Sequence, residues 1–488
     1  MNIQSYIPNQ MTRWMYEIPL LTIGFLMSVF STLQSDLVLA KEPQIQQVKV
    51  QQTRQSTAEP KSAQDYFRRA MRRYRSQDRA GAIADFDRAI QLQPNFPDAY
   101  NNRGIVKGSL GDKALAIADY SQAIALNPKF FEAYGNRGFA RLETGDRAGA
   151  LGDLDIAIRL QPNDPQLYIG RGVLLAQTGN KKAAIVSYDR AIRLRPYSLD
   201  AHYNRGLTRL DLGDIPGAIA DYNTAIKLKP TYASAYYGRG KAKAFLGDLK
   251  GAIADYDRAI KFKPDHLNAY FNRAVAKNTL GDRDGAAADY NRVIAIKPDY
   301  VNAYFNRAVL HAESGEREAA ILDYDRTIAL NPKLVEAHNN RGVLHYNMGN
   351  RAAAIVDYSS AIRLKPDYAL AHFNRGIAYY TIKDYASAIL DYNQSIALQV
   401  DNAEFYFNRG LAQYKLNNYP QAIADYDTAI RLQPTHAMAY SNRGLLHAQL
   451  QATPAATADL KKAAKLFQAQ NNEAGYQAIL RKLEQMQE

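Results

Sequence analysis

The 488-residue chain has no cysteine, and its only tryptophan is Trp14. Without cysteine the chain can form no disulfide, carries no lipid-modified cysteine and has no thiol to oxidise. It has no glycine-rich loop of the kind that cradles phosphates, because its glycines fall at turns and helix crossings of the repeats described below. No block of sequence outside those repeats is left for a catalytic domain. We therefore expect a protein that is not an enzyme and has no cofactor and no metal.

Proline recurs with a period of 34 residues. The period runs through Pro94, Pro128, Pro162, Pro196, Pro230, Pro264, Pro298, Pro332, Pro366 and Pro434, with Val400 at the one missing step. A period without drift means that each unit is one structural element stacked on the next, which predicts a solenoid. The twelve units begin at Ala63, Pro97, Phe131, Pro165, Leu199, Ala233, Leu267, Val301, Val335, Ala369, Ala403 and Ala437.

The unit at 97–130 shows why each repeat is a pair of helices. A first helical stretch ends at Gly111, which supplies the left-handed residue of a helix end, and Asp112 is placed to cap the next helix. Ala116, Tyr120 and Ala123 then form part of an apolar helical face. Pro128 ends this second helix, since it lacks an N–H and disfavours helix in the residue before it. The pattern predicts two antiparallel helices joined by a tight turn.

The Tyr…Gly…Ala…Tyr…Ala…Pro spacing and the 34-residue unit make the chain resemble tetratricopeptide repeat (TPR) proteins over residues 63–470. The resemblance implies an all-α, right-handed superhelical solenoid whose first helices line a concave groove. Val293, Thr327 and Ser395 replace a late alanine of the pattern, and the last unit is irregular. Residues 471–488 are expected to form a closing helix that caps the terminal repeat, with Tyr476, Ile479, Leu480, Leu483 and Met486 on one face.

The amino terminus is predicted to direct export. The uncharged stretch 18–30 is short for a membrane span, and Val38-Leu39-Ala40 is a small-residue cleavage pattern. Residues 1–40 are therefore interpreted as a signal peptide, with an uncleaved membrane anchor at 18–30 as the alternative. Residues 41–62 are rich in glutamine and predict a disordered linker. We expect the protein in the periplasm or an equivalent extracytoplasmic space.

The net charge of +13 raises the question of nucleic-acid binding. The repeat itself, however, places one arginine in every unit, and an aspartate at a second position in eleven units, with Ser187 as the exception. Strictly periodic opposite charges favour a ladder of ion pairs between paired helices. We therefore expect no nucleic-acid partner. The arginines are Arg69, Arg103, Arg137, Arg171, Arg205, Arg239, Arg273, Arg307, Arg341, Arg375, Arg409 and Arg443.

One basic cluster does not follow the period. It lies in the first unit and consists of Arg68, Arg69, Arg72, Arg73, Arg75 and Arg79. Such a cluster is most simply the solvated face of a terminal cap. The alternative is attraction to an anionic surface, either membrane or cell wall, where the linker emerges. We keep peripheral membrane contact through Arg68, Arg69, Arg72, Arg73 and Arg75 as a hypothesis.

The strongest functional signal is an asparagine repeated on the first helix. Nine units carry it: Asn102, Asn136, Asn204, Asn272, Asn306, Asn340, Asn374, Asn408 and Asn442. An amide side chain offers both donors and an acceptor, so a row of them can hold extended backbone without reading sequence. In the family this position faces the groove. The alternative is that these asparagines, and the aromatics beside them, pack between neighbouring repeats.

Apolar side chains accompany the asparagines. The aromatic neighbours assigned to the same peptide-binding groove are Tyr203, Tyr237, Phe271, Phe305, Phe373 and Phe407. One helical turn further on, an apolar row that we also expect to line the groove consists of Ile105, Phe139, Val173, Leu207, Val275, Val309, Val343, Ile377, Leu411 and Leu445.

Histidine gives a weak signal for metal. His202, His338 and His372 replace the periodic tyrosine, while His311, His345 and His447 share a second slot, so substitution of one ring for another is preferred to a metal site. Two functions remain. The first is an interaction scaffold or adaptor that binds an extended partner segment in the groove, and the second is a structural spacer or carbohydrate-binding component of an enzyme complex.

Overall fold

A computed structural model describes residues 61–486, and these residues form helices and their connections, with no strand. They belong to two compact units, residues 61–289 (the N-terminal unit) and residues 290–486 (the C-terminal unit). The predicted segments 1–40 and 41–60 lie outside the described residues. Ser62, the last residue of the predicted linker, caps the first helix through its side chain, which accepts a hydrogen bond from the Asp65 N–H.

The twelve predicted repeats correspond to twelve pairs of helices, which confirms the all-α solenoid fold. The helices that begin in the N-terminal unit are α3 (Ala63–Arg75), α4 (Arg79–Leu92), α5 (Pro97–Ser109), α6 (Lys113–Leu126), α7 (Phe131–Glu143), α8 (Arg147–Leu160), α9 (Pro165–Gln177), α10 (Lys181–Leu194), α11 (Leu199–Asp211), α12 (Ile215–Leu228), α13 (Ala233–Phe245), α14 (Leu249–Phe262), α15 (Leu267–Thr279) and α16 (Arg283–Ile296), the last of which contains the boundary.

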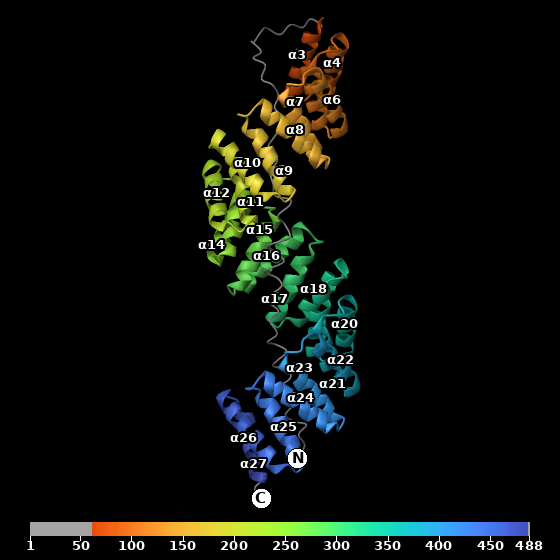
Figure 1. Cartoon of the computed structure of the whole chain (residues 1–488), viewed down its shortest axis with the longest axis vertical. Coiled ribbons are helices and arrows are strands. Elements are labelled where there is room, and N and C mark those ends of the chain that lie inside the picture. Colours follow the sequence, from red (N-terminus) through yellow and green to blue (C-terminus); the bar gives the residue numbers. More distant parts are fainter. Residues whose placement is uncertain (1–60, 487–488) are drawn as a thin grey trace. The chain divides into compact units, whose positions relative to one another are not determined.

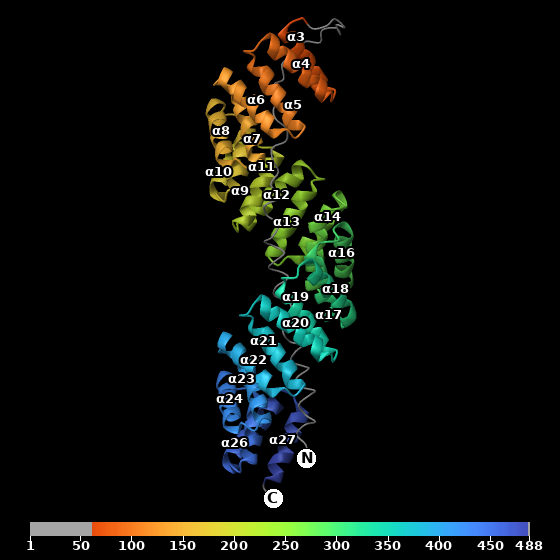
Figure 2. The same ribbon diagram turned by 90° about the vertical axis from the view of Figure 1, so that its right-hand side faces the viewer.

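The C-terminal unit continues the same alternation. Its further helices are α17 (Val301–Glu313), α18 (Arg317–Leu330), α19 (Val335–Asn347), α20 (Arg351–Leu364), α21 (Ala369–Thr381), α22 (Tyr385–Leu398), α23 (Ala403–Lys415), α24 (Tyr419–Leu432), α25 (Ala437–Gln449), α26 (Thr453–Ala469) and α27 (Glu473–Gln485). Within each unit the even-numbered second helices lie along the outer edge, as α8 and α10 or α22 and α24 do in Figure 2, and the first helices lie inside them (Figures 1 and 2).

Small residues set the close crossing of each pair. A Cβ atom built on Gly104 of α5 would lie 2.7 Å from Tyr120 Cε1 and 3.2 Å from the Ala116 carbonyl oxygen, both on α6. The tyrosine ring itself is buried. Any larger side chain at the Gly104 position would therefore overpack the crossing. The glycines and alanines of the pattern are architectural.

The turns and helix ends follow the predicted chemistry. Gly111 has φ +97°, the left-handed conformation that ends α5. The residue before Pro128, Asn127, has extended dihedrals and ends α6. At the missing proline, α22 still ends with an extended residue, Gln399, and Val400 is exposed. The neighbouring geometry of the repeat therefore suffices to end a helix where proline is absent.

The last helix covers the end of the final pair. Ile479 of α27 is buried against α26, together with Phe467 and Leu460, and Tyr476, Leu483 and Met486 pack at its edge. The helix spans Glu473–Gln485, within the predicted 471–488. Of that predicted segment, residues 487–488 lie outside the described residues.

Candidate interaction surface

The periodic arginines form the predicted ladder of ion pairs. In the second repeat the Arg103 guanidinium donates to both carboxylate oxygens of Asp119 on α6, at 2.9 Å and 2.6 Å. Equivalent pairs join Arg69 to Asp85 and Arg443 to Asp459, at opposite ends of the described chain. The prediction of ion pairs between paired helices is confirmed.

Each of the eleven ladder arginines after Arg69 also binds the preceding pair of helices, which was not predicted. Arg103 Nη1 lies 2.6 Å from Asp87 Oδ1 of α4, so one guanidinium fixes its own pair and the pair before it. The second partner is always Asp, Asn or Ser at one position of the preceding second helix, and this restriction was visible in the sequence. The partners are Asp87, Ser121, Asp155, Asp189, Asn223, Asp257, Asn291, Asp325, Ser359, Asn393 and Asp427.

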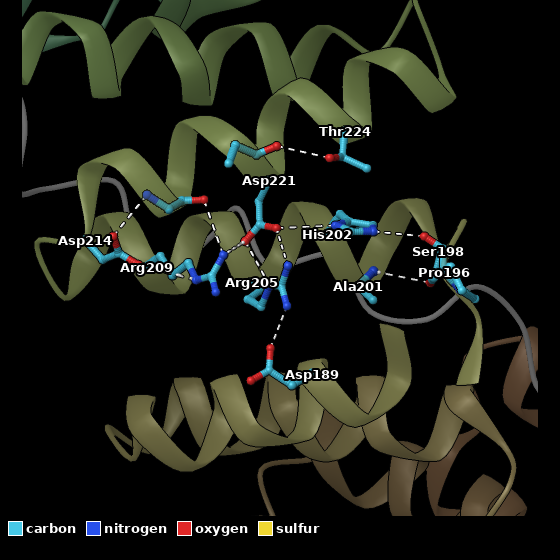
Figure 3. A network of polar contacts seen from close by, with 12 residues as sticks. Asp189, Pro196, Ser198, Ala201, His202, Arg205, Arg209, Asp214, Asp221 and Thr224 are labelled. Atoms are coloured by element: carbon cyan, nitrogen blue, oxygen red, sulfur yellow. Dashed lines mark hydrogen bonds and ion pairs between the residues drawn. The ribbon is translucent and has the colours of Figure 1, made fainter. Parts of the chain in front are cut away.

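The network around Asp221 shows the ladder at its most complete (Figure 3). Asp221 is 2% exposed and accepts from Arg205 at 2.6 Å and 2.9 Å and from Arg209 at 2.8 Å. His202 Nδ1 lies 3.3 Å from the same carboxylate. Burial raises the pKa of Asp221, but His202 and the two arginines more than offset it, so that its pKa is lowered. The carboxylate is held ionised, and its role is to stabilise the stack.

The histidines at the periodic tyrosine position contact the same proline carbonyl oxygen as the tyrosine that they replace. The Tyr168 hydroxyl donates to the Pro162 carbonyl oxygen at 3.1 Å, and His202 Nε2 lies 3.0 Å from the carbonyl oxygen of Pro196, the equivalent proline. His338 and His372 contact Pro332 and Pro366 in the same way. The interpretation as replacement of one ring by another is confirmed at these positions. Within residues 61–486, no group of three or more His, Asp or Glu side chains is arranged to hold a metal ion.

The asparagines of the predicted groove all lie on first helices, but they differ in exposure. Five are buried: Asn102, Asn136, Asn204, Asn374 and Asn408. Four are partly exposed: Asn272, Asn306, Asn340 and Asn442. The sequence does not distinguish the two groups, because exposure depends on which side chain the neighbouring repeat places over the amide.

The asparagine amides bond in two ways. Asn102, Asn408 and Asn442 donate to the carbonyl oxygen four residues earlier in their own helix, at 2.8 to 2.9 Å. Others link repeats, as Asn136 Nδ2 does with Asn101 Oδ1 at 3.0 Å.

The same kind of link runs through three repeats of the C-terminal unit. Asn374 Nδ2 donates to Asn339 Oδ1 at 3.0 Å, Asn339 Nδ2 to Asn340 Oδ1 at 3.3 Å, and Asn340 Nδ2 to the Tyr324 hydroxyl at 3.3 Å. In the N-terminal unit, Asn272 Nδ2 lies 3.1 Å from the Tyr237 hydroxyl. The Asn306 side chain makes no hydrogen bond with any described residue.

The aromatic neighbours lie between successive helix pairs. Tyr203, Tyr237, Phe271 and Phe407 are buried, and Phe305 and Phe373 are partly buried. Tyr203 packs edge to face with Tyr232 at 5.1 Å between ring centres, and Phe407 packs at a tilt against His436 at 4.7 Å. This position favours the second alternative for the aromatics, packing between repeats, over direct contact with a partner.

The apolar row one turn further on is mostly closed as well. Ile105, Val173, Leu207, Val309, Ile377 and Leu411 are buried, and Phe139, Val275, Val343 and Leu445 are partly buried. The expectation that this row offers an open apolar surface is wrong for the six buried members, because the adjacent first helices cover them.

The basic cluster of the first unit divides into paired and free cations. Arg69 and Arg73 bind Asp85 at 2.6 Å and 3.0 Å. Arg68, Arg72 and Arg75 are exposed and, at helical spacing, share one face of α3. Within the described residues no helix is long and apolar enough to cross a bilayer.

Family models of tetratricopeptide repeats match most of the described chain. A TPR repeat model matches residues 72–111, 206–244, 245–281, 277–315, 310–349, 350–383 and 382–417, and tetratricopeptide repeat models match residues 97–130, 403–436 and 136–198. Together these matches cover well over half of the chain. No curated protein matches the sequence.

Solved structures with a similar arrangement include the Cut9–Hcn1 hetero-tetramer of APC/C, at 16% identity and a TM-score of 0.42, covering 87% of this chain and 96% of that one. Yeast Tom70 aligns at 16% identity and a TM-score of 0.36, again over 87% and 96%. YrrB, described as a TPR protein with an unusual peptide-binding site, aligns at 23% identity and a TM-score of 0.34, over 38% of this chain and 95% of its own.

Proposed function

Because the chain belongs to the tetratricopeptide repeat family, whose repeats bind proteins or peptides and are generally not catalytic, we propose that it is an interaction scaffold. The proposal is that the inner helices hold an extended segment of a partner protein. The observation that carries it is the row of asparagines on nine first helices, four of which keep their amides partly exposed.

The bonding of these amides leaves capacity for a partner. Asn442 donates to the Met438 carbonyl oxygen, which lies within the helix, so the bond is a local alternative that a partner carbonyl can replace. The Asn442 side-chain oxygen and the whole Asn306 amide are bonded to no described residue. An extended backbone presents alternating N–H and C=O groups, and an asparagine side chain can pair with both. Such contacts recognise main chain and leave sequence preference to other positions.

Site-specific photocrosslinking tests the proposed surface. A photoreactive amino acid replaces Asn306 on the inner helix α17, and in a separate variant it replaces Gln394, which is exposed on the outer helix α22. We expect specific protein adducts from the first variant and none of the same adducts from the second. Equal adducts at both positions, or adducts only at Gln394, would exclude the inner surface as the binding site.

Alanine substitution provides the second test. Asn306→Ala combined with Asn442→Ala removes two partly exposed amides, and we expect capture of the crosslinked partner to fall at least tenfold with the helical content unchanged. Gln394→Ala combined with Lys462→Ala, on outer helices, is the matched control. Capture that survives loss of the inner amides would contradict the scaffold mechanism and would leave the spacer or carbohydrate-binding alternative.

The proposed location is the cell envelope, reached by export through residues 1–40. It rests on the sequence of the amino terminus and is tested by sequencing the amino terminus of the protein recovered from cells. A chain that begins at Lys41 supports cleavage after Ala40, whereas an intact, membrane-associated chain supports an anchor at 18–30. An intact chain in the cytoplasmic fraction would exclude both.

We further propose that the free face of α3 adds weak attraction to anionic lipid. Arg68, Arg72 and Arg75 are exposed along one side of the helix, and each basic residue near an anionic surface contributes about 1 kcal/mol. Vesicles containing anionic lipid should bind the protein at low salt and release it when Arg72 and Arg75 are changed to Gln. Arg69→Gln is the control, because Arg69 is paired with Asp85. Equal loss in both variants would contradict the proposal.

A further inference from the structure

One contact recurs between the turn ends of successive repeats. It joins the first residue of a second helix to the last residue of the next first helix. Lys113 of α6 pairs with Glu143 of α7 at 2.5 Å, and Lys181 of α10 pairs with Asp211 of α11. In both, a cation meets a carboxylate that the following repeat supplies.

The ninth repeat keeps the cation but lacks the carboxylate. Arg351 is the first residue of α20, at the position of Lys113 and Lys181. The next first helix, α21, ends at Thr381, at the position of Glu143 and Asp211. Thr381 is exposed, and its hydroxyl donates to the Ala378 carbonyl oxygen at 2.8 Å. Arg79, Arg147 and Arg317 likewise face no carboxylate at this position, but among the described arginines only Arg351 keeps a buried nitrogen without a partner.

The surroundings of Arg351 carry several polar atoms without partners. Its guanidinium carbon lies 3.9 Å from the centre of the Tyr346 ring, and its Nη1 atom is buried without a hydrogen bond to any described residue. The Tyr358 hydroxyl is also buried and unpartnered, as are those of the equivalent Tyr188 and Tyr392. The Arg351 nitrogen has no such counterpart in other repeats, and because buried polar atoms are satisfied in the great majority of cases it indicates a group that completes it.

Tyr346 connects the cation to the empty carboxylate position. Burial raises the pKa of Tyr346, and Arg351 and a hydrogen bond with Thr381 act in the opposite direction on the same hydroxyl. The Arg351 guanidinium therefore lies over the Tyr346 ring, and Thr381 lies beside the hydroxyl of the same tyrosine. In addition, Asn350, the residue that precedes α20, makes no side-chain capping bond, so N–H groups at this helix start remain available.

We infer that Arg351 binds a carboxylate supplied from outside the chain, an aspartate or glutamate side chain of the partner segment, at the place that Glu143 and Asp211 occupy in their repeats. The guanidinium N–H groups donate to the carboxylate, as they do in Arg–carboxylate pairs generally. The inference rests on the proposed function for the statement that the ligand is part of a protein segment. Binding of a carboxylate as such does not depend on it.

Nuclear magnetic resonance of the full chain with ¹⁵N-labelled arginine gives a direct readout. The probe is N-acetylglutamate N-methylamide, compared with N-acetylglutamine N-methylamide at matched ionic strength. The Arg351 side-chain N–H signal, assigned by its loss in Arg351→Lys, should shift saturably with the glutamate probe and not with the glutamine probe. A shift that is equal for both probes, that rises linearly with salt, or that is absent would overturn the inference.

A second variant supplies the missing carboxylate from the chain itself. Thr381→Glu should recreate the pair found at Lys113 and Glu143, raise the thermal midpoint of unfolding, and abolish the probe-induced shift of Arg351. Thr279→Glu on α15 is the matched control, because the residue equivalent to Arg351 in the repeat before it is Leu249 and offers no cation. Failure of Thr381→Glu to change either readout would also overturn the inference. These outcomes are separate from the photocrosslinking at Asn306, which tests the scaffold role alone.

Discussion

The two units of the chain differ in the number of cations that bind the buried, periodic aspartate of the ladder. In the N-terminal unit a second cation, one turn beyond the ladder arginine, also binds it. The pairs of second cation and aspartate, at 2.8 to 3.0 Å, are Arg73 with Asp85, Lys107 with Asp119, Arg141 with Asp153, Arg209 with Asp221, Lys243 with Asp255 and Lys277 with Asp289. In the C-terminal unit this second position holds His311, His345, Tyr379, Gln413 and His447. His311 and His345 stand 3.8 Å and 3.9 Å from their aspartates.

The fourth repeat shows what the second cation is for. There the aspartate is replaced by Ser187, and the second cation is replaced by Leu175, which is buried. The ladder arginine Arg171 keeps its partner on the preceding second helix, Asp155, at 2.7 Å, and donates to the Ser187 hydroxyl at 3.0 Å in place of the aspartate. Within the N-terminal unit the aspartate and its second cation are therefore present together or absent together, which indicates that the cation stabilises the carboxylate there.

Two of these aspartates, Asp221 and Asp425, differ in the direction of their pKa shifts, whereas Asp391 of the C-terminal unit, paired with Arg375 and His372, is shifted downward as Asp221 is. Burial raises the pKa of Asp425, and its single cation, Arg409, offsets this only in part, so the net shift is upward. Asp221, with His202 and two arginines, is shifted downward. Since folding favours the ionised form of Asp221 and disfavours that of Asp425, the first contributes stability at neutral pH that the second lacks.

The largest expected effect comes from neutralising these two aspartates. Asp221→Asn should cost about 3 kcal/mol of unfolding free energy at pH 7, because it leaves two arginines facing a neutral group in a buried network. Asp425→Asn should cost about half as much, since one cation is affected and folding disfavours the ionised form of this carboxyl. Chemical denaturation with one probe in each unit measures both.

The pH dependence of the unfolding free energy tests the directions of the two pKa shifts. The lowered pKa of Asp221 means that its contribution is complete above pH 3.8 and is lost as the pH falls through the folded value. The raised pKa of Asp425 means that its unfavourable contribution is relieved as the pH falls from the folded value towards 3.8. Equal costs for the two substitutions at pH 7 would contradict the expected difference between Asp221 and Asp425 in their contributions to stability.

A smaller effect distinguishes two histidines at equivalent positions. His266 in the N-terminal unit and His436 in the C-terminal unit both cap the following helix, each accepting from an N–H three residues on. Burial and the nearby Lys263 lower the pKa of His266 to about 4. Because the unfolded chain binds the proton first, stability should fall between pH 6.5 and pH 4, by about 2 kcal/mol at pH 4.5. Equilibrium unfolding across this range measures the loss.

The comparison with His436 supplies the control. His436 Nε2 lies 3.2 Å from Glu404, whereas the residue equivalent to Glu404 beside His266 is Ser234. Ser234→Glu should therefore reduce the loss on acidification, and His266→Asn, which keeps a capping side chain, should remove it. An unchanged pH profile in both variants would show that His266 is not its source.

The ladder was predictable because its geometry depends on period alone. Arg103 and Asp119 must face each other once two helices pair in every unit. The accessibility of the asparagines was not predictable, because it depends on neighbours that vary. Asn374 is 1% exposed since the preceding repeat carries Asn339 where most repeats have an aromatic ring, and the two amides bond across the interface. The carboxylate-free Arg351 could be found only once structure had shown that Lys113 meets Glu143.

Adding the second cation to a C-terminal repeat, or removing it from an N-terminal one, is expected to have a modest effect on stability. Gln413→Arg places a second cation beside Asp425, as Arg209 stands beside Asp221, and should stabilise the C-terminal unit by about 1 kcal/mol. The pKa of Asp425 should fall as a result. The converse variant, Arg209→Gln, should destabilise the N-terminal unit by a similar amount. Carboxyl titration followed by carbon NMR detects the change at Asp425, and no downward change there would contradict the assignment.

The smallest expected effect concerns the turns, where individual repeats differ in the left-handed residue. In the second to ninth repeats the left-handed residue is glycine, whereas the tenth and eleventh use Lys383 at φ +69° and Asn417 at φ +61°. Lys383→Gly should add about 1 kcal/mol to stability, and Asn417→Gly less, because asparagine tolerates this conformation. Gly213→Lys is the matched control, since a Cβ atom at Gly213 would meet nothing within 4 Å and only the backbone term changes. If Gly213→Lys costs nothing, a gain in Lys383→Gly must come from contacts of the lysine side chain and not from its backbone.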